Sequence, residues 1–280
     1  MQYYIVDAFT DMSFGGNPAG VVLLPQGSGF PDEGLMQQVA AELRYSETAF
    51  VQRNGEQEFT VRYFTPRSEV DLCGHATIAS FGVLYREGLV PEGTLCMNHT
   101  LAGDLEVVAG ERVMMEMAAP RLVGTVQEVE RLCRIMGCLA MPKMPVEIVS
   151  TGLPDIMLPV GSMDELEALN PDMEALAEMS RELEVVGVHA FVATGDGYTA
   201  HVRNFGPLYG VDEESATGTA NAALTHYLQR RGLVQPGSKC AFLQGEKMGR
   251  PSVVETMLRP DGTIYIGGKC CIVAKGELLV

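Results

Sequence analysis

The sequence predicts an α+β protein made of two similar lobes, each with a central helix that is surrounded by sheet. Three observations support this fold class. Strand-like and helix-like segments alternate along the 280 residues, and blocks of the first half recur in the same order in the second half. Each half also contains one helix-like segment that opens at a glycine and is rich in alanine, which is typical of a tightly packed helix.

The internal repeat consists of short blocks at a nearly constant spacing. Ala49-Phe50-Val51 recurs 141 positions later, and so does the pattern Val61-Arg62-x-Phe64-x-Pro66. After three inserted residues the spacing becomes 144, which matches Gly74 with Gly218. The alternative explanation is that strand-turn-helix units share such residues for generic reasons. The conserved order of several blocks favours an internal duplication.

The elements of the first half follow from hydrophobic periodicity and turn residues. Apolar runs bounded by turn residues predict strands at 3–8, 20–24, 49–52 and 59–64, and a hairpin from 101–108 and 113–117. An apolar stripe at spacings of three and four predicts a helix at 32–43. The segment 74–85 is the first of the two central helices.

In the second half, capping residues mark two helix starts. Thr125 and Glu128 have the spacing of a capping box, and an apolar stripe follows them as far as Met136. Ser162 and Glu165 repeat the same spacing. Strands are expected at 146–150, 156–160 and 185–194, and helices at 172–183 and 218–230. We therefore expect an N-terminal lobe at 1–119, completed by a strand at 270–280, and a C-terminal lobe at 120–269.

The two glycine-opened helix starts predict where a ligand binds. If the lobes are related by a pseudo-twofold axis, both helix N-termini face the cleft between the lobes, and clefts between domains are preferred ligand sites. A helix N-terminus attracts negative charge, which favours an anionic ligand in spite of the net charge of −16. We expect the active site in this cleft.

Composition excludes several functional classes. The net charge of −16, with no cluster of Lys or Arg, argues against nucleic-acid binding. The seven cysteines show no C-x-x-C spacing and the five histidines no ligand spacing, so we expect a reduced protein without a metal site. The absence of a signal peptide and of a long apolar run predicts a cytoplasmic protein without membrane contact. No glycine pattern supports a nucleotide cofactor.

Two residues are candidates for acid–base chemistry. Glu47 stands at the start of an apolar strand, where burial raises the pKa of a carboxyl and suits it to proton abstraction. The alternative is a solvated glutamate at the end of a loop. His75 follows Gly74 and either serves a substrate or bonds to neighbouring backbone. Asp71 would cap the helix or contact the histidine.

The other reactive side chains near the two helices have less distinctive patterns. A two-thiol racemase would need a partner for Cys73 near Gly218, but no cysteine stands between Cys138 and Cys240. We therefore expect Cys73 to be a buried, small apolar residue. Glu213 and Glu214 precede the second central helix, whose dipole stabilises negative charge there. Capping is expected of Glu213, whereas Glu214 would also reach the active site.

Several motifs, in order from about Tyr4 to Asn221, resemble the PhzF-like phenazine-biosynthesis family. They are Phe14-Gly15-Gly16-Asn17-Pro18-Ala19-Gly20-Val21, Ser46-Glu47-Thr48, Phe64-Thr65-Pro66 with Glu69, Asp71-Leu72-Cys73-Gly74-His75-Ala76-Thr77, and Ala216-Thr217-Gly218-Thr219-Ala220-Asn221. The resemblance implies the diaminopimelate-epimerase-like fold, in which two lobes each wrap a sheet around a central helix. It also implies a homodimer.

The resemblance further implies an isomerase that needs no cofactor and moves a proton on a small carboxylate-bearing substrate. The family's namesake isomerises a dihydro-hydroxyanthranilate. By this similarity Glu47 is the general acid/base, and His75 and Glu214 assist it. The residues expected to bind substrate are Ser46, Asp71, Gly74, Gly218, Thr219 and Asn17.

One motif departs from the family pattern. The family usually carries Glu-Asp-Pro-Ala-Thr-Gly before the second helix, whereas this chain has Glu213-Glu214-Ser215-Ala216-Thr217-Gly218. The longer side chain of Glu214 places its carboxylate further from the backbone, which bears on the identity of the substrate. Two other functions are alternatives: a catalytically idle binding member of the same fold, and a thiol-dependent racemase that uses Cys73.

Overall fold

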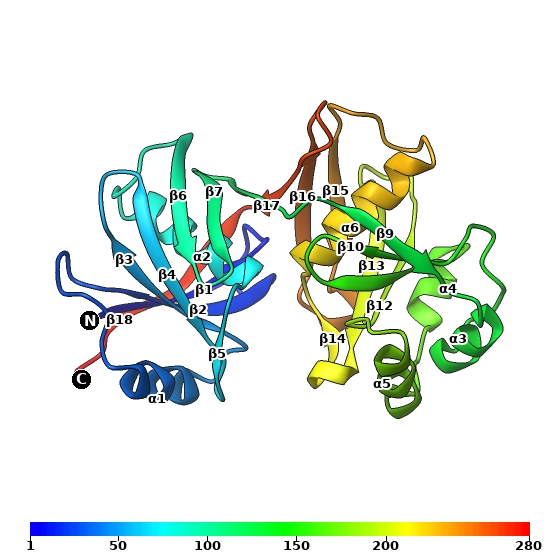
Figure 1. Cartoon of the computed structure of the whole chain (residues 1–280), viewed down its shortest axis with the longest axis horizontal. Helices are drawn as coiled ribbons and strands as arrows, with labels where there is room; N and C mark the ends of the chain where they lie inside the picture. The colour runs from blue at the N-terminus through cyan, green and yellow to red at the C-terminus, as the bar shows by residue number, and fades with distance from the viewer. The chain divides into compact units, whose positions relative to one another are not determined.

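The computed structural model describes residues 1–280, which form two compact units (Figure 1). Unit 1 comprises Met1–Glu116 and Gly267–Val280, and unit 2 comprises Met117–Ile266. Strand β17 (Ile264–Gly268) begins in unit 2 and ends in unit 1. The strand that follows it, the last of the chain, therefore belongs to unit 1. Strands dominate and helices are few, and the predicted α+β fold class is confirmed.

Unit 1 is a curved run of hydrogen-bonded strands around one helix. Its elements are β1 (Gln2–Ala8), β2 (Asn17–Leu23), α1 (Glu33–Leu43), β3 (Thr48–Arg53), β4 (Glu58–Phe64), β5 (Glu69–Val70), α2 (Gly74–Arg86), β6 (Thr94–Thr100), β7 (Gly103–Ala109), β8 (Val113–Glu116) and β18 (Cys270–Glu277). The strands pair in the order β18-β1-β2-β3-β4-β6-β7-β8. The pairs β2–β3 and β4–β6 are parallel.

Helix α2 lies at the centre of unit 1 because its side chains are small or apolar on every side. All its residues from His75 to Leu84 are buried, and the helix packs against β1, β2, β3, β7, β8 and β18. Gly82 is required there, since a Cβ at this position would collide with the sulfur of Cys270. The buried hydroxyls of Thr77 and Ser80 donate to backbone carbonyls one turn earlier, which satisfies them within the helix.

Unit 2 has the same design with two additional surface helices. Its elements are β9 (Arg121–Thr125), α3 (Val129–Met136), β10 (Glu147–Ser150), β11 (Pro154–Pro159), α4 (Met163–Ala168), α5 (Met173–Glu182), β12 (Val188–Val192), β13 (Ala200–Gly206), η1 (Pro207–Tyr209), β14 (Val211–Glu214), α6 (Gly218–Arg230), β15 (Lys239–Gln244), η2 (Glu246–Met248) and β16 (Ser252–Leu258). The strands pair in the order β9-β10-β11-β12-β13-β15-β16, and the central helix is α6.

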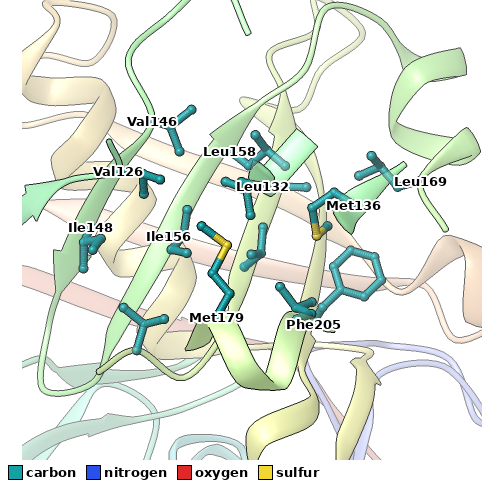
Figure 2. Close-up of a cluster of buried hydrophobic side chains, with 14 of the residues drawn as sticks. Val126, Leu132, Met136, Val146, Ile148, Ile156, Leu158, Leu169, Met179 and Phe205 are labelled. Carbon is teal, nitrogen blue, oxygen red and sulfur yellow. The ribbon is translucent and has the colours of Figure 1, made fainter. Parts of the chain in front are cut away.

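The unit 2 sheet separates an apolar face from a partly polar one. Helices α3 and α5 pack on a hydrophobic cluster that contains Leu132, Met136, Ile148, Ile156, Leu158 and Met179 among others (Figure 2). Side chains alternate along a strand, so Asp155 of β11 lies on the opposite face from Ile156. That opposite face packs against α6.

The two units repeat one topology, which supports the duplication inferred from the sequence. In each unit an antiparallel hairpin, β1–β2 or β10–β11, is followed by a strand parallel to its second member, β3 or β12. Helices α2 and α6 both have 13 residues. The bidentate ion pair of Arg62 with Glu69 in unit 1 recurs as Arg203 with Glu213 in unit 2.

The helix boundaries show where the capping patterns succeed and fail. Ser162 caps α4 by accepting a hydrogen bond from the backbone N–H of Glu165 at 3.2 Å, as predicted. The helix start predicted at Thr125 is wrong, because Thr125 ends β9, which pairs with β10, and α3 begins only after Glu128. No helix of the structure combines the length and the hydrophobicity that a membrane span requires.

Candidate functional site

The candidate site in unit 1 is formed where two separate elements begin. Glu47 directly precedes β3, and Cys73 and His75 stand at the start of α2. The β2–β3 contact fixes the first of these positions, because Gly20 donates its N–H to the carbonyl of Glu47 at 3.1 Å. Gly20 permits this approach, since a Cβ there would lie 2.8 Å from Oγ1 of Thr48.

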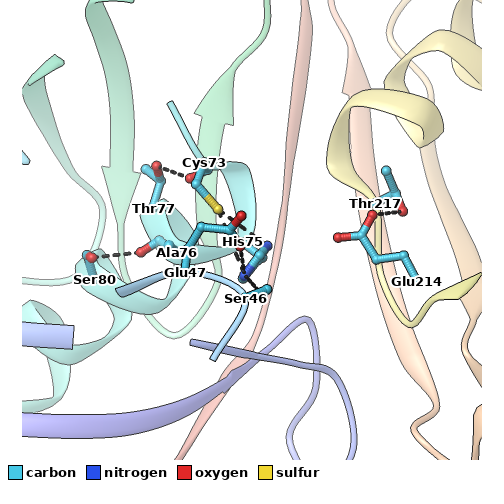
Figure 3. A network of polar contacts seen from close by, with 9 residues as sticks. All are labelled: Ser46, Glu47, Cys73, His75, Ala76, Thr77, Ser80, Glu214 and Thr217. Carbon is cyan, nitrogen blue, oxygen red and sulfur yellow. Dashed lines mark hydrogen bonds and ion pairs between the residues drawn. The ribbon is translucent and has the colours of Figure 1, made fainter. Parts of the chain in front are cut away.

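Four polar side chains meet at the start of α2 (Figure 3). Oε2 of Glu47 lies 3.2 Å from Nε2 of His75, and Oγ of Ser46 lies 3.3 Å from the same nitrogen. On the other side of the ring, Sγ of Cys73 lies 3.4 Å from Nδ1 and 3.8 Å from Nε2. The relative exposure is 7% for His75 and 20% for Glu47. The group is therefore open to solvent mainly through its carboxylate.

Burial and charge act in opposite directions on these groups. Burial alone raises the pKa of Glu47, but hydrogen bonds from His75 and Ser46 and the charge of His75 lower it below its ordinary value. Burial alone lowers the pKa of His75, but Cys73 and Glu47 raise it well above its ordinary value. Because burial raises the pKa of the Cys73 thiol, that group is neutral at neutral pH, and Glu47 is the anionic partner.

A carboxylate and an imidazolium in contact can move a proton in both directions. Glu47 is ionised and can accept a proton from a bound molecule, while His75 holds a proton that it can donate in a hydrogen bond.

The contact between Cys73 and His75 was missed by the sequence interpretation, which gave Cys73 only a packing role. The spacing alone does not indicate this contact, since residues two positions apart do not face each other on a helix, and Cys73 meets His75 because it stands before α2 in an extended conformation.

A buried hydrogen-bond chain holds the start of α2 in place. Oγ1 of Thr77 donates to the carbonyl of Cys73 at 2.7 Å and accepts from the hydroxyl of Tyr63 at 2.6 Å. Nδ2 of Asn98 in turn donates to Tyr63 at 3.0 Å. Burial raises the pKa of Tyr63, so its hydroxyl keeps its proton and remains a donor. The chain links β4, β6 and α2, and it fixes the backbone that carries Cys73 and His75.

The candidate residues of unit 2 are gathered around the start of α6. Oε2 of Glu214 accepts a hydrogen bond from Oγ1 of Thr217 at 2.7 Å (Figure 3). The side chain of Gln244 in β15 supports both residues, because its Nε2 donates to the carbonyl of Glu214 and to Oγ1 of Thr217. Its Oε1 accepts from the N–H of Thr217 and from Nδ2 of Asn221. Sequence reasoning missed Gln244, since nothing in β15 indicates its contact with α6.

Both central helices begin without a side-chain cap. Neither Cys73 before α2 nor Thr217 before α6 accepts a backbone N–H of the first turn with its side chain. The predicted substrate-binding residues Gly74, Gly218 and Thr219 stand in these first turns, where N–H groups and the helix dipole favour an anion.

Two expectations about acidic residues are corrected by the structure. Asp71 does not cap α2, because the helix starts at Gly74 and the capping position is held by Cys73 in an extended conformation. Glu213 does not cap α6 either, because its carboxylate accepts hydrogen bonds from both Nε and Nη2 of Arg203, each at 2.8 Å. Asn17 is buried at the start of β2, opposite Ala8. The proposed contacts of Asp71 and Asn17 with a substrate stay predictions.

One group of side chains has the composition of a metal site. The carboxylate of Glu47, the thiol of Cys73 and the imidazole of His75 offer ligand atoms that all lie within 4.8 Å of one another. This group was not predicted, because the spacing of the histidines shows no ligand pattern and Glu47 comes from a different element. The hydrogen-bonded group of Glu47, His75 and Cys73 is thus the best-defined reactive centre of unit 1.

Residues 6–276 match the sequence profile of the phenazine biosynthesis-like protein family, PhzC-PhzF. An uncharacterized isomerase of Deinococcus radiodurans is 37% identical, over 98% of this chain and 94% of that protein. The phenazine biosynthesis-like domain-containing protein 1 of Mus musculus is 31% identical, over 99% of this chain and 99% of that protein. Relatives of this similarity therefore occur in bacteria and in a mammal.

Solved structures of the same family have the same fold. A PhzF-family phenazine biosynthesis protein of Bacillus anthracis has a TM-score of 0.87 at 26% identity, covering 100% of this chain and 99% of that chain. A probable proline racemase of Agrobacterium radiobacter has a TM-score of 0.68 at 14% identity, covering 100% and 93%. The second likeness is one of fold alone, and it extends the architecture to racemases.

Proposed function

The chain belongs to the phenazine biosynthesis-like (PhzC-PhzF) family and is an isomerase, and we propose that it moves a proton on a small carboxylate-bearing substrate by general acid/base catalysis at Glu47. The observation that supports this role is the contact of Glu47 Oε2 with His75 Nε2 at 3.2 Å, in which the carboxyl pKa is lowered and the imidazole pKa raised. The reaction needs one group that is ionised at rest and faces solvent, and Glu47 meets both conditions.

In the proposed step, Glu47 removes a proton from a carbon atom of the substrate and becomes a neutral carboxylic acid. It then returns the proton to another carbon of the same molecule, so the enzyme ends in its starting state. Burial alone raises the pKa of Glu47. A substrate that draws the His75 hydrogen bond away from Glu47 therefore strengthens Glu47 as a base at the moment it is needed.

We further propose that the first turn of α6 binds the carboxylate of the substrate. The backbone N–H groups of Gly218 and Thr219 are the donors, and the uncapped helix start supplies the favourable dipole. Glu214, held by Thr217 at 2.7 Å, assists the proton transfer. A substrate of the dihydro-hydroxyanthranilate type, a homodimeric assembly and a cytoplasmic location complete the proposal on the basis of the family.

The direct test is incorporation of solvent deuterium. The purified protein is incubated in D₂O with a dihydro-hydroxyanthranilate and with a panel of small unsaturated carboxylates, and exchange is followed by NMR and mass spectrometry. We expect exchange with the native protein and a loss of about 10²–10⁴-fold in Glu47→Gln. Glu42→Gln, on the exposed side of α1, serves as the matched control.

Three outcomes would overturn the proposal. Full exchange in Glu47→Gln would remove Glu47 from the mechanism. Binding of a panel member without any exchange would indicate a catalytically idle binding protein. Rapid inactivation by iodoacetamide that Cys73→Ser abolishes would instead support thiol chemistry, which the raised pKa of Cys73 disfavours.

A further inference from the structure

Glu47, Cys73 and His75 bring together three kinds of ligand atom, which acid–base chemistry alone does not require. A carboxylate oxygen, a thiol sulfur and an imidazole nitrogen lie within 4.8 Å of one another. Carboxylate, thiolate and imidazole are the three protein ligands of Zn²⁺. Proton transfer at Glu47 uses the carboxylate and the imidazole, so the sulfur at this position is left without a role.

We propose that Glu47, Cys73 and His75 form a binding site for a thiophilic divalent cation of the Zn²⁺ class, and that the bound ion inhibits the isomerase. Binding of the ion goes beyond the proposed function, since it requires no substrate and no turnover, whereas its inhibitory effect rests on the proposed role of Glu47.

The distances between the side chains fit tetrahedral coordination. With a Zn–S bond of about 2.3 Å and Zn–N and Zn–O bonds of about 2.0–2.1 Å, neighbouring ligand atoms lie roughly 3.3–3.6 Å apart. Nε2 of His75 lies 3.2 Å from Oε2 of Glu47 and 3.8 Å from Sγ of Cys73. The ligand atoms of all three residues lie within 4.8 Å of one another, so side-chain rotations can bring them to bonding distance of one ion. Nε2 of His75 lies within 3.8 Å of both partners, although Sγ of Cys73 lies nearer to Nδ1, at 3.4 Å.

A fourth ligand position is available beside the same nitrogen. Oγ of Ser46 lies 3.3 Å from Nε2 of His75, and the Glu47 side chain is 20% exposed, so Ser46 or a water molecule from the solvent would be the fourth ligand. Three protein ligands with an open fourth position are typical of zinc sites that are not purely structural. The ion can enter from the side of Glu47, whereas Cys73 and His75 are almost completely buried.

The charge balance favours the ion. A thiolate and a carboxylate together compensate the double charge of the metal. The N-terminus of α2 opposes a cation, but it carries only about half an elementary charge, and it also favours the thiolate form of Cys73. The hydrogen bonds from Thr77 to Cys73 and from Tyr63 to Thr77 hold the ligand-bearing backbone in place, as supporting contacts do in metal sites.

Binding of the ion exchanges protons and transfers no electron. The Cys73 sulfur binds the metal as a thiolate and the His75 nitrogen binds it without a proton, so any protons on these two atoms pass to the solvent.

The consequence for the isomerase is inhibition that a chelator reverses. An ion bound to Oε2 of Glu47 occupies the lone pair that would accept the substrate proton, and it removes the His75 proton at the same time. The substrate and the ion then compete for one group.

The full-length protein is freed of metal with EDTA and then titrated with Zn²⁺ in competition with a chromophoric chelator, which measures the affinity and the number of bound ions. Co²⁺ serves as a second probe, because a Co²⁺–thiolate bond gives a near-ultraviolet charge-transfer band. We expect one equivalent of bound ion, a thiolate band, and a loss of affinity of about 100-fold or more in Cys73→Ser. Glu47→Gln should also weaken binding.

Two control variants separate this site from the other cysteines. Cys96→Ser removes a buried thiol on β6 outside the group, and Cys138→Ser removes a thiol that neighbours Cys133. Both controls should bind Zn²⁺ and Co²⁺ as the native protein does, and thermal unfolding confirms that each variant is folded. Equal affinity of the native protein and Cys73→Ser, or a Co²⁺ spectrum without a thiolate band, would overturn the proposal. Because these readouts need no substrate, they stand or fall independently of the isomerase activity.

Discussion

Nε2 of His75 lies 3.2 Å from Oε2 of Glu47, so the two residues form an ion pair at the point where β3 and α2 begin. The pair is asymmetric in its exposure, since the imidazole is buried and the carboxylate is partly accessible. Each partner keeps the other charged against the effect of burial. Removing one of them must therefore change the protonation of the other.

Replacement of His75 by asparagine should raise the pKa of Glu47. The hydrogen bond and charge of His75 are what lower this pKa, and burial, which raises it, remains in the variant. Since Glu47 must be ionised to accept a proton, the acidic limb of the pH profile of kcat/KM should move to higher pH. His99→Asn is the control, because His99 is an exposed residue between Glu58 and Asp104, outside the site. An unchanged acidic limb in His75→Asn would show that Glu47 is not the titrating base.

The two equivalent arginine–glutamate pairs should differ in their contribution to stability. Arg203 is the more buried arginine, and besides Glu213 its Nη1 donates to the carbonyls of Leu166 and Leu169. Arg203→Met leaves Glu213 and these carbonyls without their donor and should lower the free energy of unfolding by about 3–5 kcal/mol. Arg62→Met should cost less, because Arg62 is 22% exposed against 10% for Arg203, and its further partner is the exposed side chain of Glu33 rather than backbone carbonyls. Guanidinium denaturation of both variants measures the difference, and equal losses would contradict it.

The repeat explains how much of this fold could be predicted from the sequence. The blocks around Arg62 and Arg203, and the glycines at 74 and 218, fixed the positions of the paired strands and of both central helices. Strand β9 could not be predicted, since Leu122 and Val123 are exposed and the strand exists only because β10 pairs with it. Edge strands of this kind depend on a distant partner rather than on local periodicity.

The site was predictable only where its residues belong to local motifs. Glu47, His75 and Glu214 stand next to helix starts or turns with recognisable patterns. Tyr63, Asn98 and Gln244 reach the helix starts from strands, and the alternation of side chains along β4, β6 and β15 does not show which of them meet. Their roles follow from the packing of each sheet around its helix.

Asp155 should make the stability of unit 2 decrease as the pH rises. It is buried on the α6 side of β11, its Oδ1 has no hydrogen-bond partner, and burial together with the charge of Glu214 raises its pKa to about 8. The folded state then holds a proton that the unfolded chain releases near its ordinary pKa of 3.8. This contribution to stability is complete below that value and is lost as the pH rises through about 8.

Asp155→Asn keeps the shape of the side chain and removes the titration. Thermal unfolding between pH 6.5 and 8.5 should show a smaller decrease of stability in the variant than in the native protein. The window avoids His189, whose pKa burial lowers to about 4 and which therefore affects stability only at lower pH. Asp172→Asn, at the exposed N-cap of α5, is the control, and it should leave both the stability and the pH slope nearly unchanged, since Asn caps a helix as well as Asp does. A slope in Asp155→Asn equal to that of the native protein would mean that Asp155 is ionised in the fold.

Gln244 should be necessary for the start of α6. Its amide makes four hydrogen bonds, to the N–H of Thr217, Oγ1 of Thr217, the carbonyl of Glu214 and Nδ2 of Asn221. Gln244→Met keeps the volume and removes all four hydrogen bonds, and each buried polar group that loses its partner costs about 1–3 kcal/mol. We expect a large loss of stability, which chemical denaturation measures. In the protein that remains folded we expect a higher KM, because the N–H groups that would bind the substrate carboxylate lose their fixed orientation.

Gln235→Met is the control, since the Gln235 side chain is exposed and bonds only to its own turn at Gly232. If Gln244→Met kept a native KM with reduced stability, the start of α6 would hold its shape without Gln244, and carboxylate binding would not depend on it.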